Sequence, residues 1–535
     1  MDATPPPSIP RSTPVLFVLI FLAVFLLHAP LLHLPYFWDE AGYYVPAARD
    51  ILLTGSLIPH STVSNAHPPL VMAWLALWWK IIGFAPAVTR TAMLVLASFS
   101  LLGVFRLAET VANTSVAIAA TLCTALYPVF FAQSSLAQVD LAAAGFIFWG
   151  LSAHLEGKPV TTFLWFTLAA LAKETAILAP LALAGWEPIG LFAYGDLGAQ
   201  LWSEKQRTGT ISTRLWPLLL PALPLVFWYS YHYARTGYIF GNPEFFRYNV
   251  AATLNPTRFL LALVMRLWQM AGYLHLWVLT LAMALAIWML PPQHDPARDR
   301  PRISFPVQMD FYVVVLAYVV AMALIGGAVL ARYMLPAVPL VIILSVSTLW
   351  RRVRLWQIVI AFVALTFVAG WFWNPPYGFS PEDNLAYRDY IVMHQNAEQL
   401  LEARYPMARV LTAWPASDEL TRPWLGYLTR PMRVVRIENF SVDEVLSAAD
   451  VRSSYDVALV FSTKYESRPG VWDHWRSWTQ LKSRFFGFHR DVPPAAAAQI
   501  LGGHTVFSEQ RRGQWIAVIE IGHSEIENAE LRRLK

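Results

Sequence analysis

Long uninterrupted apolar runs constrain the fold of this chain more than any other feature. Residues 14–34 form the first run, and about 20 apolar residues in a helix are enough to cross a bilayer core of about 30 Å. This run lacks the short apolar core and the small-residue cleavage site of a signal peptide, so we expect it to be retained as a first helix. Similar runs occur at 85–107, 115–133, 140–155, 160–172, 175–193, 215–233, 263–290, 311–330, 333–350 and 355–373. The sequence therefore predicts a polytopic α-helical membrane protein with about eleven spans.

Composition supports this class and excludes others. Apolar residues make up 56% of the chain and charged residues only 14%, against about 25% charged in soluble proteins. The mean hydropathy of +0.44 excludes a disordered chain and an ordinary soluble multidomain enzyme. A single cysteine, Cys123, excludes a disulfide scaffold and a cysteine-based zinc site. The net charge is +5, but the cations are scattered between apolar runs, so we expect no nucleic-acid partner.

Two regions leave the number of spans open. Residues 68–84 are long enough for a short span or for a helix lying in the membrane interface. Residues 160–193 form either one long span or two spans hinged at Lys173-Glu174. With the hinge, and with the first helix running outward, the short inner loops are basic, as the positive-inside rule requires. These inner cations are Lys158, Lys205, Arg207, Arg214, Arg298, Arg300, Arg302, Arg351, Arg352 and Arg354.

The composition changes after Trp373. Residues 374–381 are a linker rich in proline, and no spanning run follows them. Strands are expected at 409–414, 433–437 and 456–461, with a closing hairpin at 504–508 and 515–521. Helices are expected from Ser417 to Leu428 and from Ser441, where the sequence has a capping-box pattern. We therefore predict a transmembrane domain over 1–373 and a small α/β domain over 374–535, which span parity places outside the cytoplasm.

The densest group of charges near a span end is Asp39-Glu40, in the aromatic segment Phe37 to Tyr44. Charged residues at the edge of a span are costly and therefore mark function. Two neighbouring carboxylates in apolar surroundings repel each other and take up a proton readily, which suits a general base. The alternative is an interfacial turn in which both acids are simply hydrated.

Further candidates map to the same outer side in this topology. Asp140 is the only acid between two apolar runs, and its alternative role is to cap the next helix. Lys173, Arg235, Arg247, Arg332 and His67 are cations that could grip a phosphate or diphosphate. Each of them alone could instead reach toward lipid headgroups, or, for His67, be an ordinary satisfied polar side chain. For Arg332 a simple reach toward lipid headgroups is less favoured, because Pro336 and Pro339 fix the backbone that follows it.

These residues occur in an order that resembles a known family over most of residues 15–373. The order consists of Trp38-Asp39-Glu40-x-x-Tyr43, residues 52–59, His67-Pro68-Pro69-Leu70 with Trp74 and Gly83, Arg90, Asp140, Leu171-Ala172-Lys173-Glu174 and Arg332-Tyr333-x-x-Pro336-x-x-Pro339. The chain resembles the polyprenyl-phosphate-dependent glycosyltransferases of the GT-C type, a superfamily that includes the protein O-mannosyltransferases and the lipid A aminoarabinose transferase.

The resemblance implies an inverting transfer of a sugar from a polyprenyl-phosphate donor on the outer face of the inner (plasma) membrane. Asp39 would be the catalytic carboxylate, with Glu40 and Asp140 in support. The donor phosphate would be held by Lys173, Arg247, Arg332, Tyr333 and His67. Relatives usually carry lysine at the position of His67, so a phosphate role there becomes pH-sensitive or is lost.

Several points stay open at this stage. The acceptor could be a lipid, a cell-envelope glycan or a protein. A divalent metal ion could take part, since some GT-C enzymes use one, although Asp39, Glu40 and His67 do not have a recognisable ligand spacing. The rival functions are a lipid or solute transporter and a non-catalytic membrane scaffold.

Overall fold

The computed structural model describes residues 12–201, 211–243, 246–247, 253–292, 300–325, 327–465 and 475–522. Of the predicted inner cations, Lys205, Arg207 and Arg298 lie outside these residues. Contacts within the chain divide it into two compact units. A helical unit comprises Met1–Leu32 and Ala47–Trp371, and a second unit, which contains the only sheet of the described residues, comprises His33–Pro46 and Phe372–Lys535.

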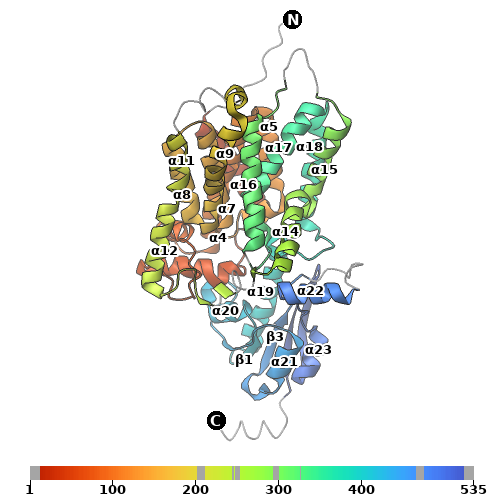
Figure 1. The fold of residues 1–535 in the computed structure, drawn as a ribbon. Helices are drawn as coiled ribbons and strands as arrows, with labels where there is room; N and C mark the ends of the chain where they lie inside the picture. The colour runs from red at the N-terminus through yellow and green to blue at the C-terminus, as the bar shows by residue number, and fades with distance from the viewer. Residues whose placement is uncertain are drawn as a thin grey trace. The chain divides into compact units, whose positions relative to one another are not determined.

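The helical unit is a bundle of α-helices (Figure 1). Its first helices are α1 Thr13–His28, α2 Val45–Thr54, α3 Leu70–Ile82, α4 Pro86–Val111, α5 Thr114–Leu126, α6 Pro128–Gln133, α7 Asp140–Leu155 and α8 Pro159–Ala172. They are followed by α9 Leu178–Leu201, α11 Ile211–Leu219, α12 Ala222–Thr236, α14 Pro256–Ala271, α15 Leu276–Met289, α16 Phe305–Leu324, α17 Val338–Arg352 and α18 Trp356–Phe372. The core of the unit includes packed pairs of these helices, among them α4 with α7 and α7 with α8.

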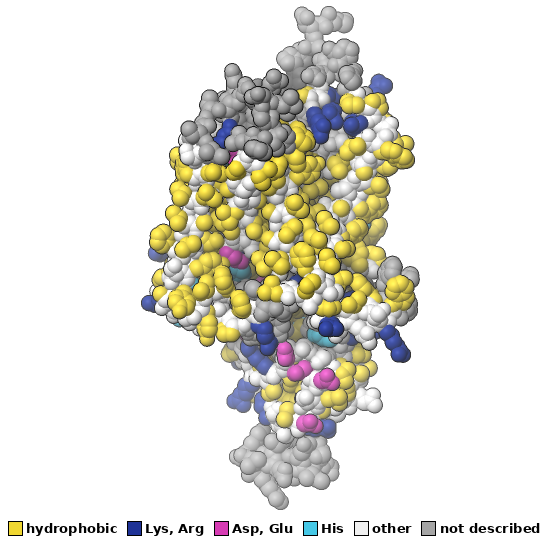
Figure 2. Space-filling model, viewed as in Figure 1, with side chains coloured by type: hydrophobic (Ala, Val, Ile, Leu, Met, Phe, Trp, Pro, Cys, Tyr) yellow, Lys and Arg dark blue, Asp and Glu magenta, His cyan; other side chains and the backbone are white. Residues whose placement is uncertain are grey.

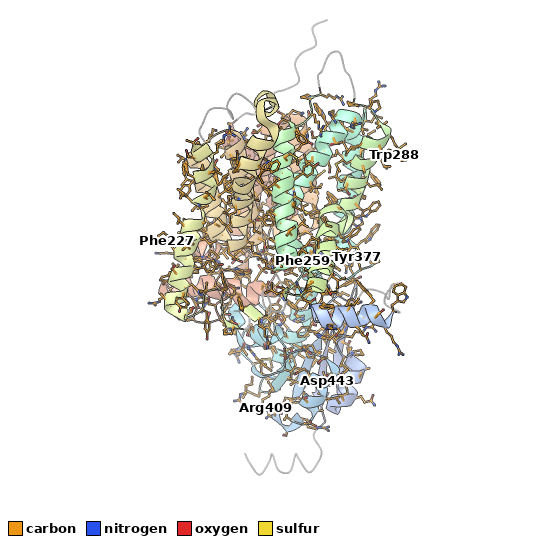
Figure 3. All side chains as sticks on the ribbon, viewed as in Figure 1. Phe227, Phe259, Trp288, Tyr377, Arg409 and Asp443 are labelled. Atoms are coloured by element: carbon orange, nitrogen blue, oxygen red, sulfur yellow. The ribbon has the colours of Figure 1, made fainter. Side chains whose placement is uncertain are left out.

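Length and surface both identify a membrane protein. Among the described residues, four helical segments are long and apolar enough to cross a bilayer, namely Thr13–Leu31, Pro86–Val111, Pro256–Met289 and Phe305–Leu324, and five shorter apolar helices accompany them. Hydrophobic side chains cover the visible face of the helical unit (Figure 2). Phe227 on α12 and Trp288 on α15 point away from the bundle and are 72% and 83% exposed (Figure 3). Such a surface is stable in lipid and not in water. The count of eleven spans and the sidedness stay predictions.

Helix breaks follow local sequence signals. The chain at 160–193 adopts the hinged alternative, because α8 ends at Ala172 and Lys173 has extended backbone angles. The predicted run 263–290 is two helices, since Leu274 and His275 leave the helical region after Gly272. The first of them starts at Pro256, earlier than expected, because the Asn255 side chain accepts hydrogen bonds from the backbone N–H groups of residues 257 and 258.

The region 68–84, whose role was open, contains only the 13-residue helix α3. At 1.5 Å per residue this helix is about 20 Å long, shorter than a bilayer core of about 30 Å. Its length favours the interfacial alternative.

The second unit is built on a five-stranded mixed sheet in the order β2-β1-β3-β5-β4. The strands are β1 Arg409–Thr412, β2 Arg433–Arg436, β3 Val457–Phe461, β4 Gly503–Arg511 and β5 Gln514–Ile521. β1 is parallel to β2 and β3, whereas β5 is antiparallel to β3 and β4. All five residues of β3 are buried, as expected for a central strand with an unbroken apolar sequence. The helices are α19 Ala386–Arg404, α20 Ala416–Thr421, α21 Val442–Ala449, α22 Arg476–Phe486 and α23 Pro494–Leu501.

Two local predictions in this unit were wrong in detail. The helix expected at 417–428 is α20, which ends at Thr421 because Arg422 precedes Pro423 and leaves the helical conformation. The capping box at Ser441 does not form, since the Ser441 side chain makes no capping hydrogen bond. The remaining strands and α21 lie where the sequence placed them.

The segment His33–Pro46 is an integral part of the second unit although it is distant in sequence. The backbone N–H of Tyr36 donates to the carbonyl of Leu425 at 3.2 Å, and the hydroxyl of Tyr427 donates to the carbonyl of Tyr36 at 3.1 Å. The Phe37 ring packs edge-on against Tyr390. The π-helix Glu40–Tyr44 follows directly.

Candidate active site

In the helical unit, Asp140 forms buried ion pairs with two cations. The ammonium of Lys173 donates to Asp140 Oδ1, and Arg332 Nε lies 3.4 Å from Asp140 Oδ2. All three side chains are less than a tenth exposed. The alternative of Asp140 as a helix cap is wrong: Val139 occupies that position, and the carboxylate faces the cations instead. Because Arg332 is buried and paired with Asp140, its side chain does not simply extend toward lipid headgroups.

Helix interruptions place both cations. Lys173 lies at the break between α8 and the 3-10 helix Glu174–Ile177, which the Tyr318 hydroxyl holds by donating to Thr175 O at 3.2 Å. Arg332 lies in the 3-10 turn Ala331–Met334 just before α17. An interrupted helix offers backbone bends at which a charged side chain is held at a defined depth.

The ring of Tyr333 is a centre around which three cations gather. Lys173 Nζ lies 4.0 Å from the ring centroid, and the guanidinium carbons of Arg266 and Arg332 each lie 5.6 Å from it. These distances are within the range of cation–π attraction. The aromatic ring therefore offsets part of the repulsion among three neighbouring positive charges.

Arg266 is a member of this group that the sequence analysis missed. It is fully buried on α14, and its guanidinium donates to Gln269 Oε1 at 2.8 Å, to Leu330 O at 2.7 Å and to Met322 O at 3.2 Å. The available signal was an arginine inside the apolar run 263–290, which membrane spans do not tolerate without a reason.

His67 and Glu174 form a second pair beside the first. His67 Nδ1 and Glu174 Oε2 are 2.8 Å apart, and Glu174 follows Lys173 directly in the chain. Burial by itself would raise the pKa of Glu174, but the charge and hydrogen bond of His67, together with the charge of Lys173, lower it to about 2. One ring nitrogen of His67 is thus already used by an acid.

The charges of this group favour an anion. Lys173, Arg266 and Arg332 are basic side chains around one ring, and the ion pairs recorded for the described residues join this group to Asp140 and Glu174. Excess positive charge in a region of low dielectric attracts a phosphate strongly. The structure thus brings together His67, Asp140, Lys173, Arg332 and Tyr333 from the predicted set. Arg247 is exposed, and its neighbours 244–245 and 248–252 lie outside the described residues.

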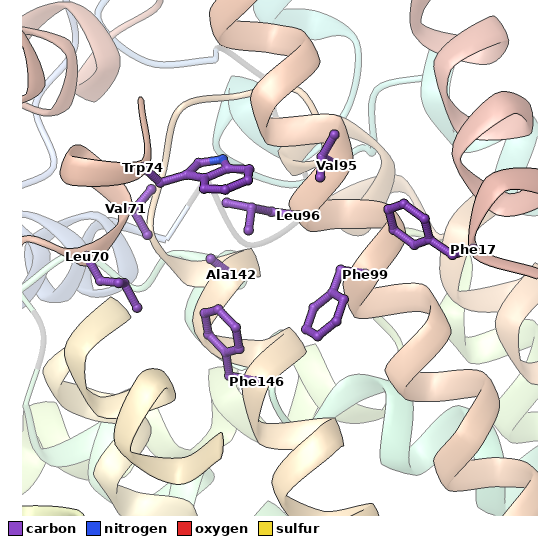
Figure 4. A pocket seen from close by; sticks show the side chains of 9 residues that line it. All are labelled: Phe17, Leu70, Val71, Trp74, Val95, Leu96, Phe99, Ala142 and Phe146. Atoms are coloured by element: carbon purple, nitrogen blue, oxygen red, sulfur yellow. The ribbon is translucent and has the colours of Figure 1, made fainter. Parts of the chain in front are cut away.

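A purely apolar pocket of about 250 Å³ shares elements with this charged group (Figure 4). It is lined by Phe17, Leu70, Val71, Trp74, Val95, Leu96, Phe99, Ala142 and Phe146. Ala142 and Phe146 lie on α7, which begins with Asp140, and Leu70 begins α3, three residues after His67. Helix α7 therefore contributes both to this pocket and, through Asp140, to the charged group.

Asp39 and Glu40 belong to the second unit and are held in an unusual backbone. Trp38 has a φ of 47°, in the left-handed region, and the π-helix Glu40–Tyr44 begins two residues later. The Trp38 ring is fixed by edge contacts with Tyr390 and Trp414. Strained residues and π-helical turns are concentrated at functional sites. Glu40 is fully buried and accepts the Phe37 N–H at 2.9 Å, whereas Asp39 is half-buried.

Within the described residues, one group of side chains has the spacing of metal ligands. It consists of His394, Glu398 and Glu419 in the second unit. This group is not evident from the sequence, because Glu419 is distant in sequence from the His-x-x-x-Glu pair on α19.

Comparison with known proteins places this fold in one structural class. No protein-family model and no curated protein sequence matches the chain. Solved structures do match, and the two of ArnT with TM-scores above 0.5 show a fold like that of this chain.

The first of these structures is ArnT from Cupriavidus metallidurans bound to undecaprenyl phosphate, with a TM-score of 0.53 and 13% identity over 95% of this chain and 98% of that chain. ArnT from the same organism in the apo state has a TM-score of 0.53 and 14% identity, over 94% of this chain and 97% of that chain. The Archaeoglobus fulgidus oligosaccharyltransferase in complex with Zn and sulfate has a TM-score of 0.44 and 12% identity, over 84% of this chain and 68% of that chain. The likeness to ArnT confirms the expected fold resemblance.

Proposed function

We propose that this protein is an inverting glycosyltransferase that takes a sugar from a polyprenyl-phosphate carrier. The observation that carries the proposal is the buried group of Lys173, Arg266 and Arg332 around Tyr333, with Asp140 between two of the cations. Such a group suits the phosphate of the donor. The fold likeness to ArnT, a protein solved with undecaprenyl phosphate, agrees with this ligand class.

The chemistry of the donor needs few groups. A polyprenyl phosphate is a good leaving group, so positive charge that stabilises the departing phosphate replaces a general acid. The acceptor hydroxyl attacks the anomeric carbon, the bond from that carbon to the phosphate oxygen breaks, and the electron pair leaves with the phosphate. The hydroxyl proton passes to a carboxylate, as in inverting glycosidases.

The charged group supplies the phosphate site in this proposal. An ammonium has three N–H donors, and the structure records one hydrogen bond from Lys173, to Asp140. Asp140 acts as the counter-charge that keeps Lys173 and Arg332 together before the donor binds. His67 contributes through Glu174, and Arg247 is a further contact of the donor from the outer loop.

The apolar pocket receives part of the polyprenyl chain. Its lining is aliphatic and aromatic, and it is built on α1, α3, α4 and α7, the last of which begins with Asp140. A carrier with a charged head and a branched apolar chain matches both surfaces.

Asp39 is the base in this proposal. It is the more exposed acid of the pair, and Glu40, which accepts the Phe37 N–H, holds the turn. Trp38 sets the position of Asp39 at the start of the π-helix. The reaction takes place on the outer face of the inner (plasma) membrane, and residues 374–535 are extracytoplasmic. A lipid, a cell-envelope glycan or a protein is the acceptor.

The test separates donor binding from transfer. Undecaprenyl phosphate binding to the purified protein is measured by native mass spectrometry, and transfer is measured by lipid and glycan profiles of cells that lack the protein and carry each variant. We expect Asp39→Asn to retain binding and to lose the product. Lys173→Met should lose both, whereas the matched controls Asp443→Asn and Lys158→Met should lose neither. Wild-type product levels with Asp39→Asn would refute the assignment of Asp39 as the base. Unchanged binding of undecaprenyl phosphate by Lys173→Met would refute the assignment of the phosphate site.

A transporter or scaffold is the alternative function. In either case the lipid and glycan profile of cells lacking the protein would show no missing transfer product.

A further inference from the structure

The second unit contains a buried cluster that the proposed transfer reaction does not use. Tyr390, His394 and Glu398 follow one another at four-residue intervals on α19, so they share one face of the helix. Glu419 reaches the same place from α20. His394 is 1% exposed, and both glutamates are fully buried.

The spacing of the donor atoms matches a metal ion. His394 Nδ1 lies 2.7 Å from Glu419 Oε2 and 3.7 Å from Glu398 Oε1, and one donor atom of each residue lies within 4.8 Å of the others. Ligands at 2.0–2.1 Å from a tetrahedral zinc ion are about 3.3 Å apart. The two measured separations lie on either side of that value, so small shifts are enough to admit the ion.

The cluster also lacks the hydrogen bonds that two buried acids need. With both acids ionised, neither carboxylate oxygen of Glu398 has a hydrogen-bond partner, and the same is true of Glu419 Oε1 and of the Tyr390 hydroxyl. A hydrogen bond between Glu398 and Glu419 requires a proton on one of the two acids. Buried carboxylates are normally paired with donors or coordinate a metal, because an unpaired buried charge is very unfavourable. One imidazole cannot satisfy two carboxylates.

The surroundings fix the orientation of the imidazole. The Tyr390 ring stacks on His394 with centroids 3.9 Å apart, and Phe461 of β3 approaches it edge-on at 4.7 Å. His394 Nε2 has no hydrogen-bond partner, so aromatic packing sets the ring plane and directs Nδ1 toward the carboxylates. An apolar shell of this kind excludes water and holds the ligands rigidly.

The geometry points to a divalent metal site formed by His394, Glu398 and Glu419, with zinc as the ion that suits one imidazole and two carboxylates. Because the cluster is closed to solvent, the ion is structural, and it joins α19 to α20. The competing arrangement is a metal-free pair in which the two carboxylates share a proton. Burial, followed by the charge of Glu419, raises the pKa of Glu398, as that arrangement requires.

The site is also connected to the Asp39 turn. Tyr390 lies one helical turn before His394, and Trp414 lies just before α20, and both rings contact Trp38. An ion joining α19 to α20 therefore stiffens the aromatic contacts of the residue that precedes Asp39. This consequence, unlike the site itself, rests on the proposed function.

The experiment measures metal content and metal-dependent stability of the full chain in detergent. Metals are quantified by mass spectrometry after purification in metal-free buffer, and again after treatment with a chelator and reloading with Zn²⁺. The variants are Glu398→Gln and Glu419→Gln. The matched control is Glu402→Gln, one turn further along α19, where the carboxylate accepts hydrogen bonds from residues 429 and 430.

We expect about one zinc ion per chain in the wild type and in Glu402→Gln, and at least a tenfold loss in the two cluster variants. Added Zn²⁺ should raise the unfolding temperature of the chelator-treated wild type and leave that of Glu398→Gln unchanged. Equal metal content in the wild type and both cluster variants would overturn the site. So would a metal-free Glu398→Gln protein that is more stable than the wild type, because that is the behaviour of a proton-sharing pair.

If the cluster variants do not fold, Zn²⁺ titration of the chelator-treated wild type decides the question. Competition with a chromophoric chelator should give one tight equivalent, and weaker, non-stoichiometric binding would overturn the site. These outcomes do not depend on sugar transfer, so they are distinguishable from failure of the proposed function.

Discussion

Replacing Asp140 by asparagine removes a carboxylate that faces two buried cations. At the 3.4 Å that separates Asp140 Oδ2 from Arg332 Nε, the attraction is about 5 kcal/mol for an effective dielectric constant of about 20. Desolvation offsets part of this attraction, and breaking a buried ion pair on one side costs about 3–5 kcal/mol, because the remaining charge has lost its partner. We therefore expect Asp140→Asn to lower the free energy of unfolding by about 3–5 kcal/mol.

The partner variant is predicted to be less harmful. In Lys173→Met, Asp140 retains Arg332, so no buried charge is left without a counter-charge. In the double variant, the introduced asparagine side chain faces one cation instead of two. The double variant should therefore lose less stability than the sum of the two single losses, by about 1–3 kcal/mol, which is the range of coupling between residues in direct contact.

Unfolding in mixed micelles, followed by tryptophan fluorescence, measures all three variants. Asp443→Asn and Lys158→Met are the controls, since both side chains are exposed, and they should stay within about 0.5 kcal/mol of the wild type. A loss below about 1 kcal/mol for Asp140→Asn, or additive losses in the double variant, would refute the idea that these charges form one electrostatic unit.

Two further predictions concern the turn at Asp39 and the pair at His67. Gly42→Ala should destabilise the protein by about 1–3 kcal/mol in the same unfolding assay, because a Cβ at this position would lie 2.7 Å from the Trp414 ring; an unchanged midpoint would contradict the tight packing of that turn. Glu174 has a pKa lowered from 4.5 to about 2, so its ionised form stabilises the fold above pH 4.5 and that stability is lost as the pH falls toward 2. The stability difference between wild type and Glu174→Gln should accordingly shrink as the pH falls below 4.5 toward 2, and a difference that grows over that range would show the opposite sign.

Local patterns explain why much of the fold could be predicted. An apolar run is visible in the sequence whatever it packs against, so α4, α7, α8 and α18 lie close to the expected ranges, whereas α16 starts and ends six residues earlier than expected. The strands at 409, 433 and 457 were found for the same reason, since a short buried strand is rich in β-branched and apolar residues. Errors occurred at helix ends, where one capping asparagine or one proline moves the boundary by several residues.

Only part of the candidate site could be predicted from the sequence. Asp140, Lys173 and Arg332 stood out because each interrupts or borders an apolar run. Arg266 carried the same signal inside the run 263–290 and was overlooked. The cluster of His394, Glu398 and Glu419 carried none, because contact between residues distant in the chain leaves no mark in a single sequence. Which side chain faces Tyr333, or which two acids meet, is decided by tertiary packing.

The pairing of His33–Pro46 with residues after 371 also has a consequence for biosynthesis. Tyr36 and Tyr427, joined by a hydrogen bond, are 391 residues apart in the chain. A ribosome finishes the early segment long before its packing partners exist, and domains generally form as their last strands and helices become available. The turn that carries Asp39 therefore gains its native contacts only near the end of translation, so a truncated nascent chain retained in the membrane would have its helices but not this turn.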